Sequence, residues 1–187
     1  MLYSLDVGCG YTRDHMKKGE IGVDIKRGLC DVVASAYHLP FKDNCFEKVI
    51  MSHILEHLTE WALALKEATR VLTQKGILQI EVPNPYSFGI FKDVLLKRRD
   101  FYKASEDHIC AFGENELRNL LTKLNYELIS LKYVNCARTE KKLERSSWLK
   151  RTFYNLILPI FPAFRTAIRV ECKMKSRDVG DKAFQMR

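Results

Sequence analysis

The N-terminal segment constrains the fold of this chain more than any other part of the sequence. Residues 5–7 form a short apolar strand that runs into a turn containing Gly8 and Gly10, and residues 21–24 form a second short strand that ends on Asp24. Because glycine has no Cβ, such a turn is sharp and approaches a ligand closely. In open α/β sheets, ligands bind beyond the carboxyl ends of the strands. The segment therefore predicts a nucleotide-binding α/β sheet in which Asp24 accepts hydrogen bonds from a ribose diol.

The spacing argues against a dinucleotide cofactor. The position of the third glycine in a Gly-x-Gly-x-x-Gly fingerprint is occupied by Arg13, and thirteen residues separate Gly10 from Asp24. That interval has room for a short helix at most, whereas a dinucleotide fold places a full helix with its N-terminus against the pyrophosphate. S-adenosylmethionine has an adenosine and an amino-acid tail but no phosphate. The glycine turn and the acidic residue suit it without that helix.

Four motifs in order resemble those of the class I S-adenosylmethionine-dependent methyltransferases, in particular the methyltransferase type 11 group. The motifs are the glycine turn with Asp24, the turn within 31–41, the segment 46–58 that contains His53-Ile54-Leu55-Glu56-His57, and the strand 76–84. The resemblance covers residues 4–134 and, more loosely, a strand near 168–175. In one departure, Ser35 stands where the family commonly has an acidic residue for the adenine amino group.

The resemblance implies a Rossmann-like, doubly wound α/β fold. Such a fold has a mostly parallel seven-stranded sheet, helices on both faces and an antiparallel final strand. Apolar spacing independently predicts helices over 59–73 and 114–124 and a strand over 127–134. With no internal repeat or linker, the chain is expected to be a single domain over residues 1–187.

Two segments interrupt this regular pattern. Residues 85–113 follow the expected fifth strand and mix aromatic with basic residues, so we expect a substrate lid there. Residues 138–165 form a basic apolar element. Its pattern suits contact with a membrane or a lipid-like substrate, or packing over the sheet edge or in a homodimer.

The resemblance assigns roles to individual residues at the strand ends. The expected cofactor-binding residues are Asp6, Gly8, Cys9, Gly10, Asp24, Ile25, Ser35, Ala36, Tyr37 and Ser52. His53, at the end of the fourth strand, is the candidate general base for an acceptor that must lose a proton. His108 is the second catalytic candidate, because it precedes the helix at 114–124 and could close the site. Glu56 and His57 are interpreted as structural residues.

No metal site is expected from the sequence. The six cysteines form no C-x-x-C pair and no metal-ligand spacing, which favours reduced thiols in a cytoplasmic protein. The N-terminus does not have the pattern of a signal peptide. The longest uncharged apolar run, 152–164, has thirteen residues, fewer than the ~20 that span a bilayer.

Charge distribution suggests the class of acceptor. Residues 1–90 have 10 Lys and Arg against 11 Asp and Glu, whereas residues 91–187 have 21 against 12. A basic second half favours an anionic partner. We expect a methyltransferase that acts on a small-molecule or lipid-like acceptor with anionic character. An RNA methyltransferase and a catalytically weak, cofactor-binding scaffold protein stay open as alternatives.

Overall fold

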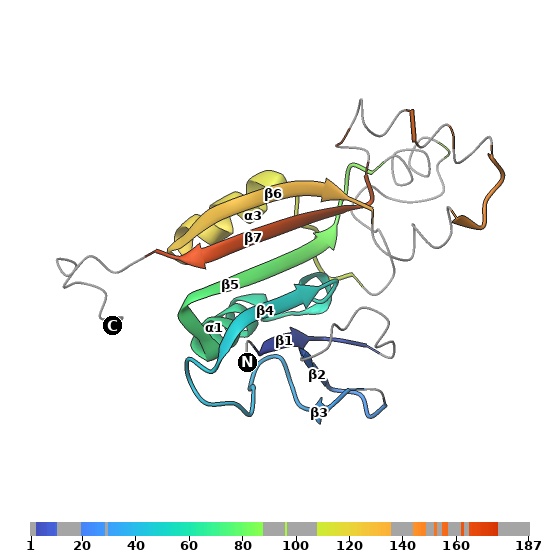
Figure 1. Cartoon of the computed structure of the whole chain (residues 1–187). Coiled ribbons are helices and arrows are strands. Elements are labelled where there is room, and N and C mark those ends of the chain that lie inside the picture. Colours follow the sequence, from blue (N-terminus) through green and yellow to red (C-terminus); the bar gives the residue numbers. More distant parts are fainter. Residues whose placement is uncertain are drawn as a thin grey trace.

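The computed structural model describes most of the sheet and two helices (Figure 1). The described residues are 3–10, 20–28, 30–87, 96, 108–135, 144–148, 152, 155–156, 162 and 165–175. The strands are β1 (Ser4–Val7), β2 (Glu20–Asp24), β3 (Val32–Val33), β4 (Phe46–Ser52), β5 (Leu72–Pro83), β6 (Tyr126–Val134) and β7 (Ala167–Met174). The helices are α1 (Trp61–Val71) and α3 (Glu114–Lys123), and a 3-10 turn, η2, spans Leu55–His57.

The seven strands form one sheet in the order β3-β2-β1-β4-β5-β7-β6. The pairs from β3 to β5 are parallel, and β7 is antiparallel to both β5 and β6. The predicted mostly parallel, seven-stranded sheet with an antiparallel final strand is therefore confirmed. Residue 49 pairs with residue 78, and residue 78 pairs with residue 172, so the pleat aligns the side chains of neighbouring strands in rows.

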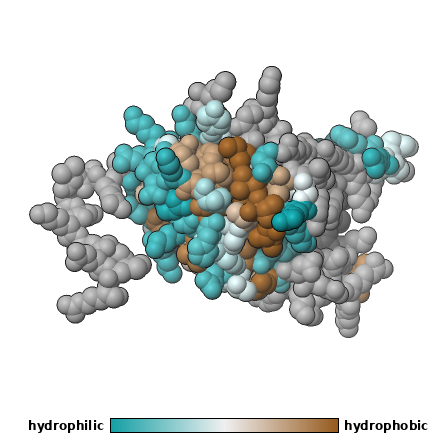
Figure 2. Space-filling view, turned by 90° about the horizontal axis from the view of Figure 1, so that it is seen from below, coloured by the Kyte–Doolittle hydropathy of each residue, from teal (hydrophilic) through white to brown (hydrophobic). Residues whose placement is uncertain are grey.

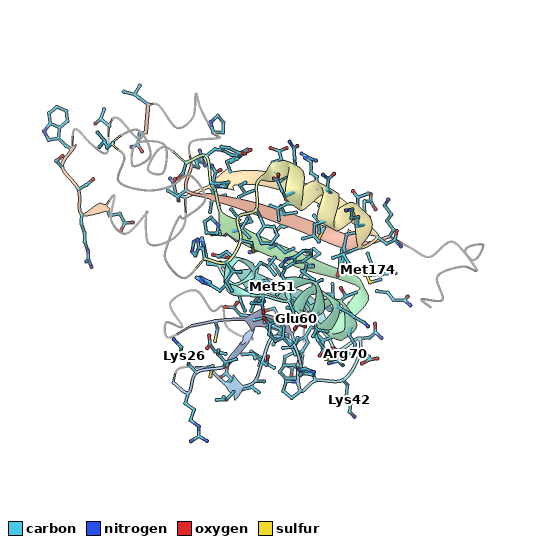
Figure 3. All side chains as sticks on the ribbon, turned by 180° about the vertical axis from the view of Figure 1, so that it is seen from behind. Lys26, Lys42, Met51, Glu60, Arg70 and Met174 are labelled. Carbon is cyan, nitrogen blue, oxygen red and sulfur yellow. The ribbon has the colours of Figure 1, made fainter. Side chains whose placement is uncertain are left out.

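One face of the sheet forms the hydrophobic core. The alternate residues Val49, Leu78 and Cys172, which are neighbours across three strands, are fully buried. Both α1 and α3 lie over this face, as the views from the front and from behind agree (Figures 1 and 3). The second layer of helices expected on the other face has no counterpart among the described residues.

The opposite face of the sheet is polar over its central strands. Ser52 pairs with Glu81, and Glu81 pairs with Arg169, so these three side chains form a row. Arg169 Nε lies 2.8 Å from Glu81 Oε2, and Lys48 Nζ lies 4.0 Å from Glu171 Oε1. Opposite charges on this face are therefore paired, between the neighbouring strands β5 and β7 for Glu81 with Arg169, and across β5 for Lys48 with Glu171.

Helix α1 ends earlier than its apolar spacing predicts. The sequence favours a helix to residue 73, but the helix ends at Val71, and Leu72 already pairs with Phe46 of β4. A Cβ on Gly76 would lie 2.7 Å from the Leu72 side chain. Glycine at position 76 thus lets the backbone of β5 pass close to the side chain of Leu72, the first residue of the same strand.

The β3 side of the molecule retains exposed apolar surface. Seen from below, apolar and hydrophilic side chains share this face (Figure 2). Ile25, just after β2, and Val33, on β3, are 68% and 52% exposed. The edge strand β3 has two residues, which limits the unpaired backbone that the edge presents.

Several predictions fall mainly outside the described residues. These are the lid over 85–113 and the basic apolar element over 138–165, and with them the single-domain organisation stays a prediction. Among the described parts of the chain, no helix is long and apolar enough to cross a membrane. The five cysteines in those parts, Cys9, Cys30, Cys45, Cys110 and Cys172, are free thiols.

Candidate active site

The candidate site lies where four parallel strands end. Gly8 follows β1, Asp24 ends β2, His53 follows β4 and Asn84 follows β5. Because these strands are parallel, their carboxyl ends meet at the same edge of the sheet. The strand order is β2-β1-β4-β5, so these four positions are neighbours in space.

Glycine is needed at the two positions of this turn for different reasons. Gly8 and Gly10 have φ angles of +76° and +67°, in the left-handed region that side chains disfavour. A Cβ on Gly8 would lie 2.5 Å from Ile54 Cδ1, whereas a Cβ on Gly10 would meet no atom of the described residues within 4 Å. Close packing against Ile54 thus explains why position 8 is a glycine. The expected approach to a ligand fits the open space at Gly10.

Asp24 joins the end of β2 to the glycine turn. Its Oδ2 accepts a hydrogen bond from the Gly10 backbone N–H at 2.9 Å, and its Oδ1 accepts one from the Lys26 N–H at 2.9 Å. These contacts fix the orientation of the carboxylate. A carboxylate oxygen can accept more than one hydrogen bond, so both oxygens keep capacity for further donors.

The segment around Ser35 forms a compact turn. Ser35 Oγ accepts a hydrogen bond from the Tyr37 N–H at 3.2 Å, and the Ser35 carbonyl accepts one from the His38 N–H at 3.1 Å. Ala36 is buried between them. The Tyr37 hydroxyl lies 3.4 Å from Thr59 Oγ1, so this turn contacts the segment that leads into α1.

The remaining expected cofactor residues occupy the same region. Asp6 lies on β1, Ser52 ends β4 and Ile25 directly follows β2. Burial, with Asp6 and Asp24 nearby, raises the pKa of the Cys9 thiol to about 11. Cys9 is therefore a neutral thiol near pH 7 and does not present a thiolate nucleophile.

His53 is held between two carboxylates. Its Nδ1 lies 3.3 Å from Glu56 Oε1, and its Nε2 lies 3.3 Å from Glu81 Oε1. Burial lowers the pKa of His53, but the two carboxylates outweigh burial and raise it to about 10. An imidazolium has no lone pair with which to accept a proton. A base role, which stays a prediction, therefore requires His53 to lose its proton first.

Glu81 anchors the other end of this ion-pair network. Its side chain is buried, which raises its pKa, but His53 and Arg169 reverse that effect and hold the pKa below its usual value. His53 itself has a φ of +53°, unusual for a residue with a side chain. The network thus holds a strained backbone position at the end of β4.

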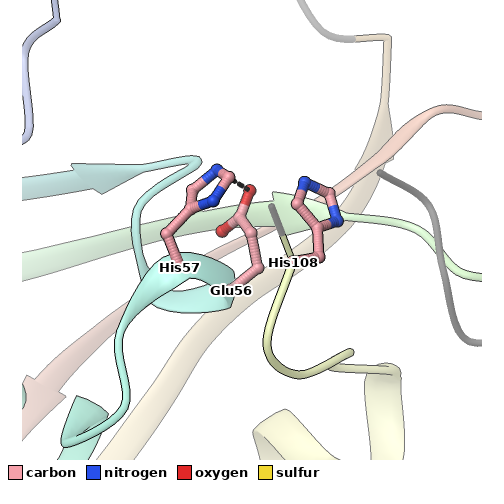
Figure 4. A group of neighbouring side chains, drawn as sticks. All are labelled: Glu56, His57 and His108. Atoms are coloured by element: carbon pink, nitrogen blue, oxygen red, sulfur yellow. Dashed lines mark ion pairs between the residues drawn. The ribbon is translucent and has the colours of Figure 1, made fainter. Parts of the chain in front are cut away.

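His108 lies beside residues that the sequence analysis interpreted as structural. The ring centroids of His57 and His108 are 4.8 Å apart in an edge-to-face arrangement, and Glu56 lies next to both (Figure 4). Glu56 thereby links His53 to this pair of histidines. In the sequence, the His-x-x-Glu-His pattern of residues 53–57 was the signal that could have placed Glu56 and His57 beside His53.

Asn84 has a structural role in the described residues. Its Nδ2 donates to the Arg165 carbonyl at 2.7 Å, and its Oδ1 accepts a hydrogen bond from the Tyr86 N–H at 3.0 Å. The side chain is fully buried. Asn84 thus ties the end of β5 to the segment that enters β7.

Comparison with known proteins finds a methyltransferase domain over part of the chain. Residues 5–80 match the family model described as a methyltransferase domain. This match covers about two fifths of the chain, and over that part the chain is similar to the class I S-adenosylmethionine-dependent methyltransferases. The cofactor of this family is S-adenosylmethionine, as the motifs predicted.

Solved structures of methyltransferases share the fold of this chain. A SAM-dependent methyltransferase from Thermotoga maritima superposes with a TM-score of 0.62 at 18% identity, covering 92% of this chain and 82% of that one. A SAM-dependent methyltransferase from Archaeoglobus fulgidus gives a TM-score of 0.61 at 19% identity, covering 92% and 86%. At these identities the likeness shows the fold.

Sequence relatives are longer than this chain. An uncharacterized protein of Methanocaldococcus jannaschii, MJ0638, is 35% identical over 111 residues, which are 52% of this chain and 44% of the relative. A second, MJ1252, is covered to 42% of its length. The chain thus spans less than half the length of the curated relatives it matches.

The described residues fit S-adenosylmethionine. The carboxylate of Asp24 is oriented by two backbone donors and can accept further hydrogen bonds. Beside Gly10, at the same turn, a Cβ would meet no atom of the part of the chain that the structure describes within 4 Å, which suits a ligand there. Asp24 and the Gly10 turn are therefore suited to the ribose and the amino-acid tail of this cofactor.

Proposed function

We propose that this methyltransferase transfers a methyl group from S-adenosylmethionine to a small-molecule or lipid-like acceptor with an anionic group. The observation that supports it is the convergence of the Gly8–Gly10 turn, Asp24 and His53 at one sheet edge. The cofactor, when bound, supplies an electrophilic methyl group on a sulfonium. The chain's own residues bind and orient the two reactants.

Proximity supports much of the proposed catalysis. Positioning a nucleophile near a reacting carbon can supply up to roughly 10⁵–10⁸ M of effective concentration. Asp24 is fixed by the N–H groups of Gly10 and Lys26, and His53 is fixed by Glu56 and Glu81. Such restrained groups suit a site that works by orientation. In this arrangement both ring nitrogens of His53 face carboxylates, so His53 contributes a ring held in a fixed position at the end of β4.

The anionic character of the acceptor is inferred from charge. The second half of the sequence has an excess of nine basic over acidic residues, and this half contains the insertions 85–113 and 138–165. Both insertions adjoin strands of the sheet, and 85–113 follows the carboxyl end of β5. Basic residues in the segment that follows β5 in the sequence favour a phosphorylated or carboxylated acceptor.

Transfer of a labelled methyl group into fractionated cell extract tests the acceptor class. The protein is incubated with S-adenosylmethionine labelled on the methyl group and with separate small-molecule, lipid and RNA fractions. Label in the small-molecule or lipid fraction is expected. Label confined to RNA would replace this proposal with RNA methylation, and no transfer by a protein that binds the cofactor would favour a scaffold.

Vesicle sedimentation separates lipid-like from soluble acceptors. If residues 138–165 bind a lipid surface, the protein sediments with anionic vesicles and is released as salt rises, because salt screens the charges. Glutamate in place of Lys141, Lys142, Lys150 and Arg151 is expected to abolish that binding and spare cofactor binding. A wild-type protein that ignores vesicles would point to a soluble anion.

A further inference from the structure

Three side chains of kinds that commonly ligate metals lie close together beside the candidate active site. Glu56 and His57 lie on η2, and His108 lies in the segment before α3. One ligand atom from each lies within 4.8 Å of those of the other two, and Glu56 Oε1 is 4.0 Å from His57 Nε2 (Figure 4). Imidazole nitrogens and a carboxylate oxygen together are ligands typical of zinc and related transition metals.

The Glu56 carboxylate is an unusual group to find buried. Its side chain is 2% exposed, and neither oxygen accepts a hydrogen bond from the part of the chain that the structure describes. The contact with His53 Nδ1 at 3.3 Å is an ion pair. Burial of a carboxylate without hydrogen bonds is costly. Coordination to a cation would satisfy these oxygens.

The backbone already holds the three residues together. The carbonyl of Glu56 accepts a hydrogen bond from the Ile109 N–H at 2.8 Å and a longer one from the Cys110 N–H at 3.4 Å. The segment that contains His108 is therefore attached to η2 at Glu56 itself. Such support from the scaffold is what a precise ligand site requires.

We propose that Glu56, His57 and His108 form a binding site for a divalent transition-metal ion of the zinc type. Metal–ligand bonds of about 2.0–2.2 Å place tetrahedral ligand atoms roughly 3.4 Å apart. The ligand atoms must therefore approach one another by about 0.5–1.5 Å, which rotation about the side-chain bonds can supply while the backbone stays fixed. Three protein ligands leave a further coordination position open.

The open position gives the site a relation to methyl transfer. His53 contacts Glu56 and directly follows β4, so the metal site adjoins the strand end assigned to the acceptor. An oxygen of a carboxylate or hydroxyl acceptor would complete the coordination. This last step rests on the proposed function, whereas metal binding itself does not.

Zinc titration of the full chain tests the site. After removal of metals with a chelator, the wild-type protein is titrated with Zn²⁺ and, in parallel, with Co²⁺, whose visible absorption reports its ligands. One equivalent of Zn²⁺ is expected to bind. His57→Ala and His108→Ala should each weaken that binding at least tenfold. His38→Ala is the matched control, because His38 is exposed and lies outside the cluster, and it should bind as the wild type does.

Three results would overturn the proposal. They are a wild-type protein that binds no Zn²⁺, equal affinity in the His57→Ala and His108→Ala variants, and binding of Mg²⁺ as tight as that of Zn²⁺, since Mg²⁺ prefers oxygen ligands. Circular dichroism checks that each variant folds, and His108→Gln replaces His108→Ala if that variant does not. S-adenosylhomocysteine binding is measured on the same samples, so loss of the metal site is distinguishable from failure of the proposed function.

Discussion

His53 and Glu81 are joined both through the backbone and through their side chains. The His53 N–H donates to the Glu81 carbonyl at 2.8 Å, and His53 Nε2 lies 3.3 Å from Glu81 Oε1. The second carboxylate oxygen of Glu81 lies 2.8 Å from Arg169 Nε. One buried carboxylate thus fixes the ends of β4 and β5 and contacts β7.

Removal of the Glu81 carboxylate is expected to destabilise the sheet. Glu81→Ala leaves His53 and Arg169 without their shared partner, and because both are partly exposed the free energy of unfolding should fall by about 1–3 kcal/mol. Urea denaturation measures the change. Glu47→Ala, an exposed carboxylate on β4, is the control and should change it by less than about 0.5 kcal/mol. Equal effects of the two substitutions would contradict the role of Glu81.

Gly8 and Ile54 should be energetically coupled. Gly8→Ala places a Cβ 2.5 Å from Ile54 Cδ1 and adds strain of about 1–2 kcal/mol at a positive φ. The double variant Gly8→Ala with Ile54→Ala removes the contacts with Cδ1 and Cγ1 but keeps the Ile54 Cβ at 3.0 Å and the backbone strain, so the two changes should destabilise less together than the sum of each alone. A double-mutant cycle by thermal unfolding measures this coupling. Strict additivity would show that Ile54 does not dictate glycine at position 8.

Gly10 should respond differently from Gly8. Gly10→Ala introduces the same type of strain but meets no atom of the described structure within 4 Å. The protein should fold with a modest loss of stability and bind S-adenosylhomocysteine more weakly, because the added methyl group occupies the open space beside Asp24. Calorimetry and a melting curve on the same sample distinguish the two effects. Unchanged affinity would place the cofactor elsewhere.

Acid should weaken the contact between α1 and the loop that joins β3 to β4. Glu67 pairs with Arg70 and accepts a hydrogen bond from the Leu39 N–H, and Arg70 above all lowers the pKa of Glu67 from 4.5 to about 2. Since this pKa is lower in the folded state, the stabilisation is present above pH 4.5 and is lost as pH falls toward 2. Glu67→Gln should melt with a smaller dependence on pH across that interval. Identical pH profiles would contradict the assignment.

Sequence reasoning succeeded where a residue's place follows from its strand. The positions of Gly10, Asp24 and His53 at one edge follow from short apolar strands that run parallel. Sequence reasoning missed the role of Glu56. Its position as a buried carboxylate between His53 and the His57–His108 pair depends on contacts between segments that are remote in the sequence. It also missed the packing of Ile54 on Gly8, since no periodic pattern encodes a single close contact.

The central claim is that Asp24 and the Gly10 turn bind S-adenosylmethionine. Calorimetric titration with S-adenosylhomocysteine tests it most directly. Binding to the wild-type protein is expected, with a loss of about 1.5–3 kcal/mol in Asp24→Asn through weaker ribose hydrogen bonds. Asp43→Asn, whose carboxylate pairs with Arg70 away from the turn, should bind as the wild type does. A wild-type protein that binds NAD and not S-adenosylhomocysteine would contradict the account.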